Sequence, residues 1–208
     1  MDTRSFPTKG NLMANKNSLA LAKQGYELMD KKRNILINEI MAITEKVKPI
    51  RSEIDRTFAE AYAALERANV QLGAKTIVDM ADSVPMENSI KIYSRSVMGA
   101  EIPEVVYDSP KVLPLYPFAS TRQSLDEAME KFIKVKELTI RLAELESAAF
   151  RLATAINKTQ KRANALKNIT IPRYEELVKS ISSSLEEKER EDFTRLKVIK
   201  RFKENSKT

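Results

Sequence analysis

The sequence lacks two residue types on which many active sites depend. None of its 208 residues is a cysteine or a histidine, which excludes disulfide bonds, thiolate chemistry and the imidazole ligands that zinc usually takes. Only 4 glycines are present, and because they are isolated along the chain they form no glycine-rich phosphate-binding loop. We therefore expect no catalytic, cofactor-binding or metal-binding residues, and a protein that is not itself an enzyme.

Long apolar runs are also missing. No stretch reaches the roughly 18 apolar residues that a membrane-spanning helix requires, and the first residues contain no apolar core of a secretion signal. We expect a cytoplasmic protein that reaches a membrane, if at all, through partner proteins.

Two long apolar patterns, spaced by three and four residues, dominate the chain. This spacing is typical of the contact seam of a coiled coil, and at about 1.5 Å per residue each pattern predicts a helix on the order of 100 Å long. The first consists of Leu12, Leu19, Ala22, Tyr26, Met29, Leu36, Ile40, Ile43, Val47, Ile50 and Ile54. The second consists of Leu125, Met129, Phe132, Val135, Leu138, Leu142, Leu145, Ala149, Leu152, Ile156, Thr159, Ala163 and Leu166, then Tyr174, Leu177, Ile181, Leu185, Leu196 and Ile199.

Local irregularities interrupt both patterns. Phe58, Leu65 and Leu72 continue the first pattern one position later, which predicts a stutter in the seam. Pro49 is expected to kink its helix, and Pro172 either to kink its helix or to start a new one. Arg33 falls on a seam position, where its charge must reach outward or find a partner.

One amphipathic helix of this length would leave its apolar stripe in water. We therefore expect the two helices to pack as an antiparallel pair with both termini at one end. The predicted fold is dominated by α-helix: a long antiparallel two-helix coiled coil with a small central β-hairpin and irregular region. The predicted segments are an N-terminal segment at 1–9, a long helix at 10–82, a central region at 83–121, and a C-terminal long helix with a tail at 122–208.

The central region contains five of the 8 prolines, which excludes a long helix there. Residues 89–97 and 102–107 are typical of strands, and Gly99 suits the turn between them, so we expect a β-hairpin at about 89–107. Six of its residues are predicted to form a docking surface for another chain: Tyr93, Val97, Met98, Gly99, Val105 and Tyr107. The alternative is that the hairpin folds back onto the helices as a local cap.

The net charge of +7 is unevenly distributed. Counted along the sequence, residues 1–50 carry +4, residues 51–150 carry −4 and residues 151–208 carry +7. If the two basic ends meet in space, they present one positive surface to an acidic partner. The alternative is that these charges are ordinary solvated helix faces.

Three ordered blocks of sequence resemble the family of D subunits of V-type and A-type ATPases. The first comprises Pro7-Thr8-Lys9, Leu12, Leu19, Ala22, Gly25, Leu28-Met29, Lys32-Arg33 and Leu36; the second Val97-Met98-Gly99 and Ile102-Pro103; the third residues 162–166, Ile171-Pro172, residues 185–191 and Arg195-Leu196-Lys197. The sequence departs from the family's pattern at Asn15, Asp30, Asn34, Gln160 and Lys161.

This resemblance implies a non-catalytic component of the central stalk, a rotor shaft that couples ATP hydrolysis or synthesis to rotation of a membrane ring and to proton or sodium transport. The implied partners are a hexamer of catalytic A and B subunits around the paired termini, the F subunit at the central region, and the funnel-shaped C/d subunit that links the shaft to the ring. It implies no cofactor, no nucleic acid and no direct membrane insertion, and a cytoplasmic position peripheral to the membrane.

Basic side chains near both termini are then predicted to face the stator subunits, because screened charge pairs tolerate several angular positions. They are Lys9, Lys16, Lys23, Lys197, Lys200, Arg201 and Lys203.

Two other classes of protein fit the composition. A basic coiled coil that binds nucleic acid or an anionic membrane would lose its binding with salt. A bacterial scaffold or chaperone-like coiled coil would not co-purify with ATPase subunits.

Overall fold

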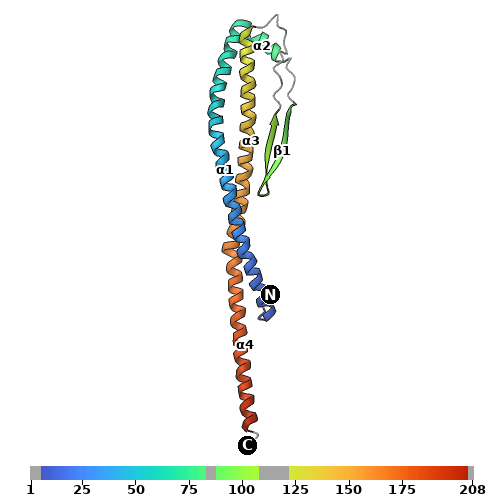
Figure 1. The fold of residues 1–208 in the computed structure, drawn as a ribbon, viewed down its shortest axis with the longest axis vertical. Coiled ribbons are helices and arrows are strands. Elements are labelled where there is room, and N and C mark those ends of the chain that lie inside the picture. Colours follow the sequence, from blue (N-terminus) through green and yellow to red (C-terminus); the bar gives the residue numbers. More distant parts are fainter. Residues whose placement is uncertain (1–5, 83–87, 108–121, 206–208) are drawn as a thin grey trace. The chain divides into compact units, whose positions relative to one another are not determined.

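The computed structural model describes residues 6–82, 88–107 and 122–205. Long helices and a two-stranded antiparallel sheet confirm the predicted fold class (Figure 1). Within the described ranges, no helix is both long and apolar enough to span a bilayer. Four prolines of the predicted central region lie outside the described residues: Pro85, Pro110, Pro114 and Pro117. In chain order the elements are α1 (Lys9–Leu72), α2 (Ala74–Ala81), β1 (Ile90–Val97), β2 (Ala100–Tyr107), α3 (Gln123–Ala165), the π-helical turn η3 (Leu166–Thr170) and α4 (Ile171–Asn205).

The internal contacts of the chain divide it into two compact units. Unit 1 consists of Met1–Arg33 and Asn157–Thr208, and unit 2 of Asn34–Ile156. Helices α1 and α3 contribute to both units, because the boundary falls inside each of them. Unit 1 holds the two ends of the chain, and unit 2 holds the hairpin.

Helix α1 is 64 residues long, and local signals mark both of its ends. At its start, the Asn11 backbone N–H donates to Thr8 Oγ1 at 3.2 Å, which satisfies one of the free donors of the first turn. Pro49 lies inside the helix, so it removes one backbone hydrogen bond without ending the helix. The helix stops before Gly73, whose φ of 84° is left-handed, a conformation that glycine adopts without steric cost.

The seam of unit 2 follows the predicted positions as far as Ile54, but the predicted stutter is wrong. Phe58, Leu65 and Leu72 are only half-buried. Large apolar side chains dominate a sequence pattern, whereas the buried positions here are small, and small side chains let two helices approach closely. The buried positions after Ile54 keep the spacing of three and four residues: Thr57, Ala61, Ala64 and Ala68.

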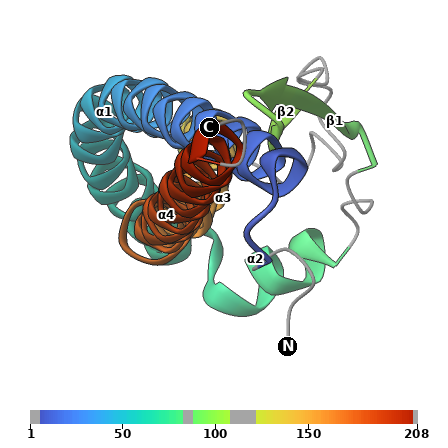
Figure 2. The ribbon, with the colours of Figure 1, turned by 90° about the horizontal axis from the view of Figure 1, so that it is seen from below.

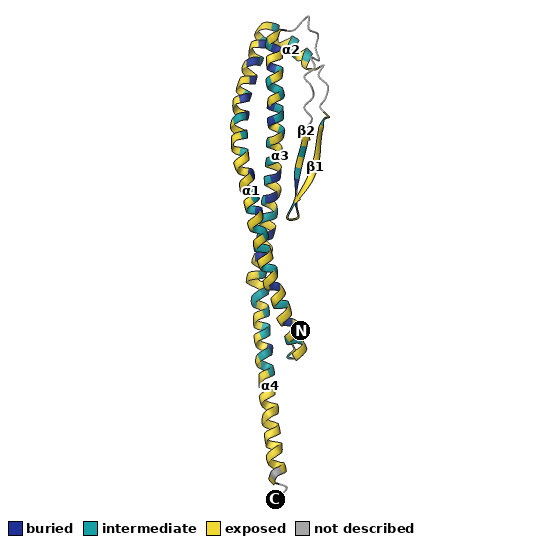
Figure 3. Ribbon diagram, in the orientation of Figure 1, coloured by how far each residue is buried: buried dark blue, intermediate teal, exposed yellow. Residues whose placement is uncertain are grey.

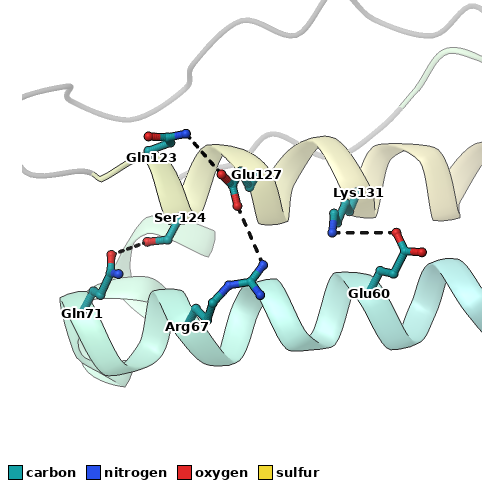
Figure 4. Close-up of polar contacts among 7 residues, drawn as sticks. All are labelled: Glu60, Arg67, Gln71, Gln123, Ser124, Glu127 and Lys131. Carbon is teal, nitrogen blue, oxygen red and sulfur yellow. Dashed lines mark hydrogen bonds and ion pairs between the residues drawn. The ribbon is translucent and has the colours of Figure 1, made fainter.

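Polar contacts at one end of unit 2 show the direction in which α1 and α3 pack (Figure 4). Residue numbers rise along α1 as they fall along α3, so the helices are antiparallel, as predicted. The ion pairs among these contacts are partly exposed and contribute little stability, so the apolar seam carries most of the packing energy. The contacts are Glu60–Lys131 at 3.8 Å, Arg67–Glu127 at 3.8 Å and Gln71–Ser124 at 2.8 Å.

The predicted hairpin is confirmed, with β2 starting at Ala100 instead of Ile102. Its turn consists of Met98, with φ of 50°, and Gly99, with φ of 75°. Two successive residues with positive φ are typical of the type I′ turn, which matches the right-handed twist of two paired strands. Val97 therefore pairs with Ala100, and the antiparallel ladder continues from there to Ile90 and Tyr107.

The hydrophobic core of unit 2 joins the hairpin to both long helices. Ala100 and Ile102 of β2 are buried there, with 7% and 4% of their surface exposed. The adjacent half-buried residues include Val97 at the end of β1 and Ile40 on α1. The hairpin is thus part of the packed structure of unit 2 and not a free arm. The helical residues of this core are Leu36 and Ile43 of α1 and Ala148 and Leu152 of α3.

The seam of unit 1 is more polar than that of unit 2. Asn15 and Thr159 are buried in this unit, with 2% and 5% of their surfaces exposed, and its buried apolar residues are Ala22, Ala163 and Ile181. A buried polar residue at a seam position favours one register of two helices over others, at some loss of stability. Asn15 occupies such a position.

The predicted seam extends too far along α4. Leu196 and Ile199, predicted as seam positions, are 65% and 53% exposed. The reason is that α1 begins at Lys9, whose Nζ lies 3.0 Å from Glu189 Oε1. No part of α1 is left to cover the residues of α4 beyond that point.

A π-helical turn separates α3 from α4. In a regular helix, the residue at position 172 would donate its N–H to the carbonyl of Asn168, but Pro172 has no N–H and its ring would clash there. The wider turn of η3, Leu166–Thr170, gives the chain room to pass this point while staying helical. The side chain of Thr170 also donates to the carbonyl of Ala165, at 3.4 Å.

The buried seam predicts a large difference between two Leu→Ala substitutions. Leu36 is fully buried and Leu196 is 65% exposed. Leu36→Ala should lower the free energy of unfolding by about 2–5 kcal/mol because it leaves a cavity, whereas Leu196→Ala should change it by less than about 0.5 kcal/mol. Urea unfolding of the isolated chain, followed by circular dichroism, measures both. Equal losses would contradict the assignment of the core.

Candidate functional site

The predicted basic residues of the N-terminal region lie on α1 in unit 1. Lys9 and Lys23 form ion pairs with α4, to Glu189 at 3.0 Å and Glu175 at 2.8 Å. Lys16 is exposed. All four paired side chains are at least half exposed, so these ion pairs add little stability. The ammonium groups remain accessible from solvent.

The predicted basic residues of the C-terminal region lie on α4 beyond Glu189. From Glu186 to the end of α4, every side chain that the structure describes is exposed (Figure 3). Residues 193–203 contain five basic residues and no acidic residue. We call this stretch the α4 tip. Its basic residues are Arg195, Lys197, Lys200, Arg201 and Lys203, of which Arg195 was not among the predicted ones.

The α4 tip also exposes large apolar side chains, which sequence reasoning had assigned to the seam or passed over. Phe193 and Phe202 are 69% and 71% exposed. At about 100° per residue, these two positions lie on opposite sides of the helix. The apolar surface therefore surrounds the tip instead of forming one stripe. The sequence did contain a signal of this exposure, because the apolar residues from Phe193 to Phe202 do not keep the spacing of three and four positions that a seam requires.

The six predicted docking residues of the hairpin do not all face solvent. Tyr93 and Met98 are 56% and 46% exposed, and Gly99 is exposed in the turn. The other three, Val97, Val105 and Tyr107, are half-buried. Sequence reasoning missed two further exposed apolar residues of the hairpin, Ile90 and Ile92, although the alternation along the strand could have indicated them.

Polar contacts add to the apolar core that holds the hairpin against the helices. Arg95 Nη2 lies 3.2 Å from Glu39 Oε1 of α1. On the other strand, the Lys136 ammonium of α3 lies 5.3 Å from the centre of the Tyr107 ring, a cation–π distance. The alternative in which the hairpin caps the helices thus describes β2 best, since β1 contacts the rest of unit 2 through Arg95 and Val97 and is otherwise exposed.

A polar network crosses unit 1 close to the π-helical turn. Arg33 Nη2 lies 2.7 Å from Asp30 Oδ1, and Arg33 Nη1 donates to Gln160 Oε1 at 2.9 Å. Gln160 Nε2 in turn donates to Asn164 Oδ1, also at 2.9 Å. Arg33 therefore meets its predicted need for a partner. Asp30 and Gln160 each contact the same guanidinium.

The surfaces described so far offer positive charge and apolar contact. Surface hollows along α4 are lined by residues of that helix alone, such as Arg190 and Thr194, so they are open grooves and not enclosed pockets. Among the described residues, no group of three or more acidic side chains is arranged to hold a metal ion. These features suit contact with macromolecules.

Known proteins resemble this chain along nearly its whole length. A family model for the D subunit of ATP synthases matches residues 11–201. The D subunit of the V-type ATP synthase of Thermotoga neapolitana is 41% identical over 194 residues, which cover 93% of this chain and 96% of that protein. The D subunit of the A-type ATP synthase of Pyrococcus horikoshii is 39% identical over 197 residues, covering 93% and 92%. That of Methanobrevibacter smithii is 38% identical, covering 93% and 85%.

The Arg33 network predicts an unequal effect of two Arg→Met substitutions. Arg33→Met removes a charged hydrogen bond to Gln160 and leaves Asp30 without this cation, so it should lower the free energy of unfolding by about 1–3 kcal/mol. Arg195→Met, which removes only an exposed contact to Glu191 at 3.9 Å, should have almost no effect. Thermal unfolding of the two variants tests this. A small loss for Arg33→Met would show that the network is dispensable for stability.

Proposed function

Because the chain belongs to the family of ATP synthase D subunits, we propose that it is the non-catalytic central-stalk component of a V-type or A-type rotary ATPase. In this role it couples ATP hydrolysis or synthesis in a hexamer of A and B subunits to rotation of a membrane ring, and so to proton or sodium transport. Nucleotide is bound and cleaved by the hexamer. The chain acts at the cytoplasmic side of the membrane, held there by other subunits.

The α4 tip is the observation that carries this proposal. A helix that is apolar on several sides is usually enclosed by protein, and Phe193 and Phe202 lie on opposite sides of this one. No other described part of unit 1 covers them. An opening at the centre of a ring of subunits would surround such a helix on all sides. We therefore assign the tip to the central opening of the A/B hexamer.

The basic residues of both chain ends explain how a shaft can grip a ring and still turn inside it. Exposed charge pairs are worth little individually and tolerate varied geometry, so they can be exchanged as the shaft rotates. Interlocked apolar side chains would have to be pulled apart at each step. Acidic groups on the hexamer would then attract Lys197, Lys200 and Arg201 at several angular positions, with Lys9, Lys16, Lys23 and Lys203 adding to the field.

The hairpin is assigned to partner docking in unit 2. Its outward side chains, including Tyr93 and Met98, offer apolar and aromatic contact area of the kind that is enriched at protein interfaces. The F subunit is the partner proposed for this region. The end of unit 2 where Leu72 and Gln123 terminate their helices is assigned to the funnel-shaped C/d subunit.

Neutralising the tip should change rotation. In the variant with Lys197→Gln, Lys200→Gln and Arg201→Gln, attraction to the hexamer falls by about 1 kcal/mol for the three exposed charges together, so dwells should shorten by up to about fivefold. Single-molecule rotation of the assembled complex measures the dwell times. Before that measurement, co-purification of the A, B and F subunits with the tagged chain tests the assembly itself.

A matched control carries the same change in net charge away from the tip. Lys46, Lys48 and Arg51 are exposed residues of α1 in unit 2, and their replacement by glutamine should leave dwell times unchanged. If the tip variant rotates like this control, charge at the tip does not set the dwells. If neither the tip variant nor the control variant retains the A, B and F subunits, the central-stalk assignment itself is wrong.

The outward face of the hairpin should contribute to binding. The double variant Tyr93→Ser and Met98→Asn removes the two exposed side chains, while an Asn-Gly turn preserves the type I′ geometry. Loss of an aromatic contact at an interface typically costs about 1–2 kcal/mol, so the Kd for the F subunit should rise by about tenfold. Titration of the purified F subunit into the chain measures this Kd. An unchanged Kd would remove the F subunit as the partner of this face.

A further inference from the structure

The two edges of the hairpin present different sets of backbone groups. Since Val97 and Ala100 flank a two-residue turn, they form a hydrogen-bonded pair, and such pairs alternate with non-hydrogen-bonded pairs along the ladder. The residues of the non-hydrogen-bonded pairs direct their N–H and C=O groups away from the other strand. On β1 these residues are Ile90, Ile92, Ser94 and Ser96, and on β2 they are Glu101, Pro103, Val105 and Tyr107.

The outer edge of β2 is closed to a further strand. Pro103 has no N–H to donate, and it stands at one of the outward-directed positions. The carbonyl of Glu101, also directed outward, accepts a hydrogen bond from Arg151 Nη1 of α3 at 3.4 Å. Both neighbours of Glu101, Ala100 and Ile102, are buried in the core of unit 2. Proline and cover by a helix are the means by which sheet edges are usually protected.

Within the described residues, the outer edge of β1 has no such protection. Seven of its eight residues are exposed, and the remaining one, Val97, is half-buried. The strand contains no proline, and no backbone hydrogen bond from elsewhere in the described residues reaches its outward-directed groups. In two views β2 lies between β1 and α3, which leaves β1 on the outside (Figures 2 and 3).

We propose that the free edge of β1 takes up an extended segment of a neighbouring subunit as a third strand of the sheet. This inference rests on the docking role proposed for the hairpin and specifies how the docking occurs. Main-chain hydrogen bonds to Ile92 and Ser94 supply the contact, as in other complexes formed by addition of a strand. Because the core of unit 2 holds the hairpin in place, the edge is already ordered before the partner arrives.

The side chains of β1 indicate the chemistry of the incoming strand. Lys91 and Arg95 lie on one face of the strand, β1 has no acidic residue, and Ile90 and Ile92 lie on the other face. Arg95 is already paired with Glu39 of α1, so Lys91 is the cation that an incoming strand would meet. Cross-strand pairs of opposite charge and of apolar side chains are favourable. The partner segment should therefore carry acidic residues on the face of Lys91 and apolar residues on the face of Ile92.

The same charges argue against a second copy of this chain as the occupant. Pairing of β1 with another β1 would bring Lys91 and Arg95 of each copy onto two adjacent strands that have no acidic side chain, and among the described residues only Arg95 of these cations has an acidic partner, Glu39 of α1. Like charges on neighbouring strands are destabilising. A strand of a different, acidic segment avoids this cost.

Amide hydrogen exchange tests the proposal on the unmodified full-length chain. In the isolated chain, the amides of Ile92, Ser94 and Ser96 should exchange rapidly, while those of Tyr93 and Arg95, within the β1–β2 ladder, should exchange slowly. In the complex assembled with its A, B and F subunits, exchange at Ile92 and Ser94 should slow by at least about tenfold. Exchange is quenched after assembly and read residue by residue by NMR of the released chain.

A matched pair of variants tests the contribution of the edge to affinity. Ser94→Pro removes one outward N–H while leaving the β1–β2 hydrogen bonds, as Pro103 does on β2. Ser94→Ala keeps that N–H. Ser94→Pro should raise the Kd for the partner subunits by about tenfold or more, and Ser94→Ala should not. Lys91→Glu should weaken binding more than Lys91→Gln. If Ser94→Pro disrupts the hairpin, the exchange measurement on the unmodified chain decides.

Slowed exchange at the β1 edge in the complex, together with weaker binding of Ser94→Pro, would support the proposal. Normal assembly with unchanged exchange at Ile92 and Ser94 would overturn it while leaving the central-stalk function intact. Protection of the edge in the chain alone, with a dimer detected by sedimentation, would overturn it in favour of a second copy. Failure of the chain to assemble with the A, B and F subunits would remove both the function and this inference.

Discussion

The apolar seam between α1 and its partner helices holds the chain in its antiparallel arrangement. Neither long helix could bury its stripe alone, and most helical stability in water comes from such packing. The hairpin depends on the same seam, because its core residue Ile102 packs with Leu36 and Leu152. The ion pairs along the helices are largely exposed and add little. Loss of the seam in unit 2 would therefore remove the surface against which the hairpin packs.

Polar groups within the seam lower the stability of the helix pair but fix the register of the two helices. Asn15 and Thr159 are buried in unit 1, and Arg33 reaches across from α1 to Gln160. A purely apolar pair of helices can slide by a heptad with little change in buried area, whereas a displaced polar group loses its hydrogen bonds.

The sequence was sufficient to predict the fold class, because apolar residues that recur every three or four positions indicate the seam of a helix pair. The sequence was insufficient to predict the burial of single residues, because burial depends on which other helix packs against them. Ala64 is more deeply buried than Leu65, and Leu196 continues the pattern of Leu185 but has no helix to pack against. The hairpin and the basic ends were both located from the sequence. Which strand faces outward could not be predicted, because it depends on a core formed by residues far apart in the chain.

The ending of α1 opposite Glu189 has a mechanical consequence. Two helices locked side by side resist bending more than the sum of two separate helices, because each prevents the other from sliding lengthwise. Of the residues that the structure describes, only α4 continues beyond Glu189, so bending within unit 1 concentrates in that single helix. If the far end of α4 is held while the rest of unit 1 is displaced, this single helix takes up most of the elastic strain.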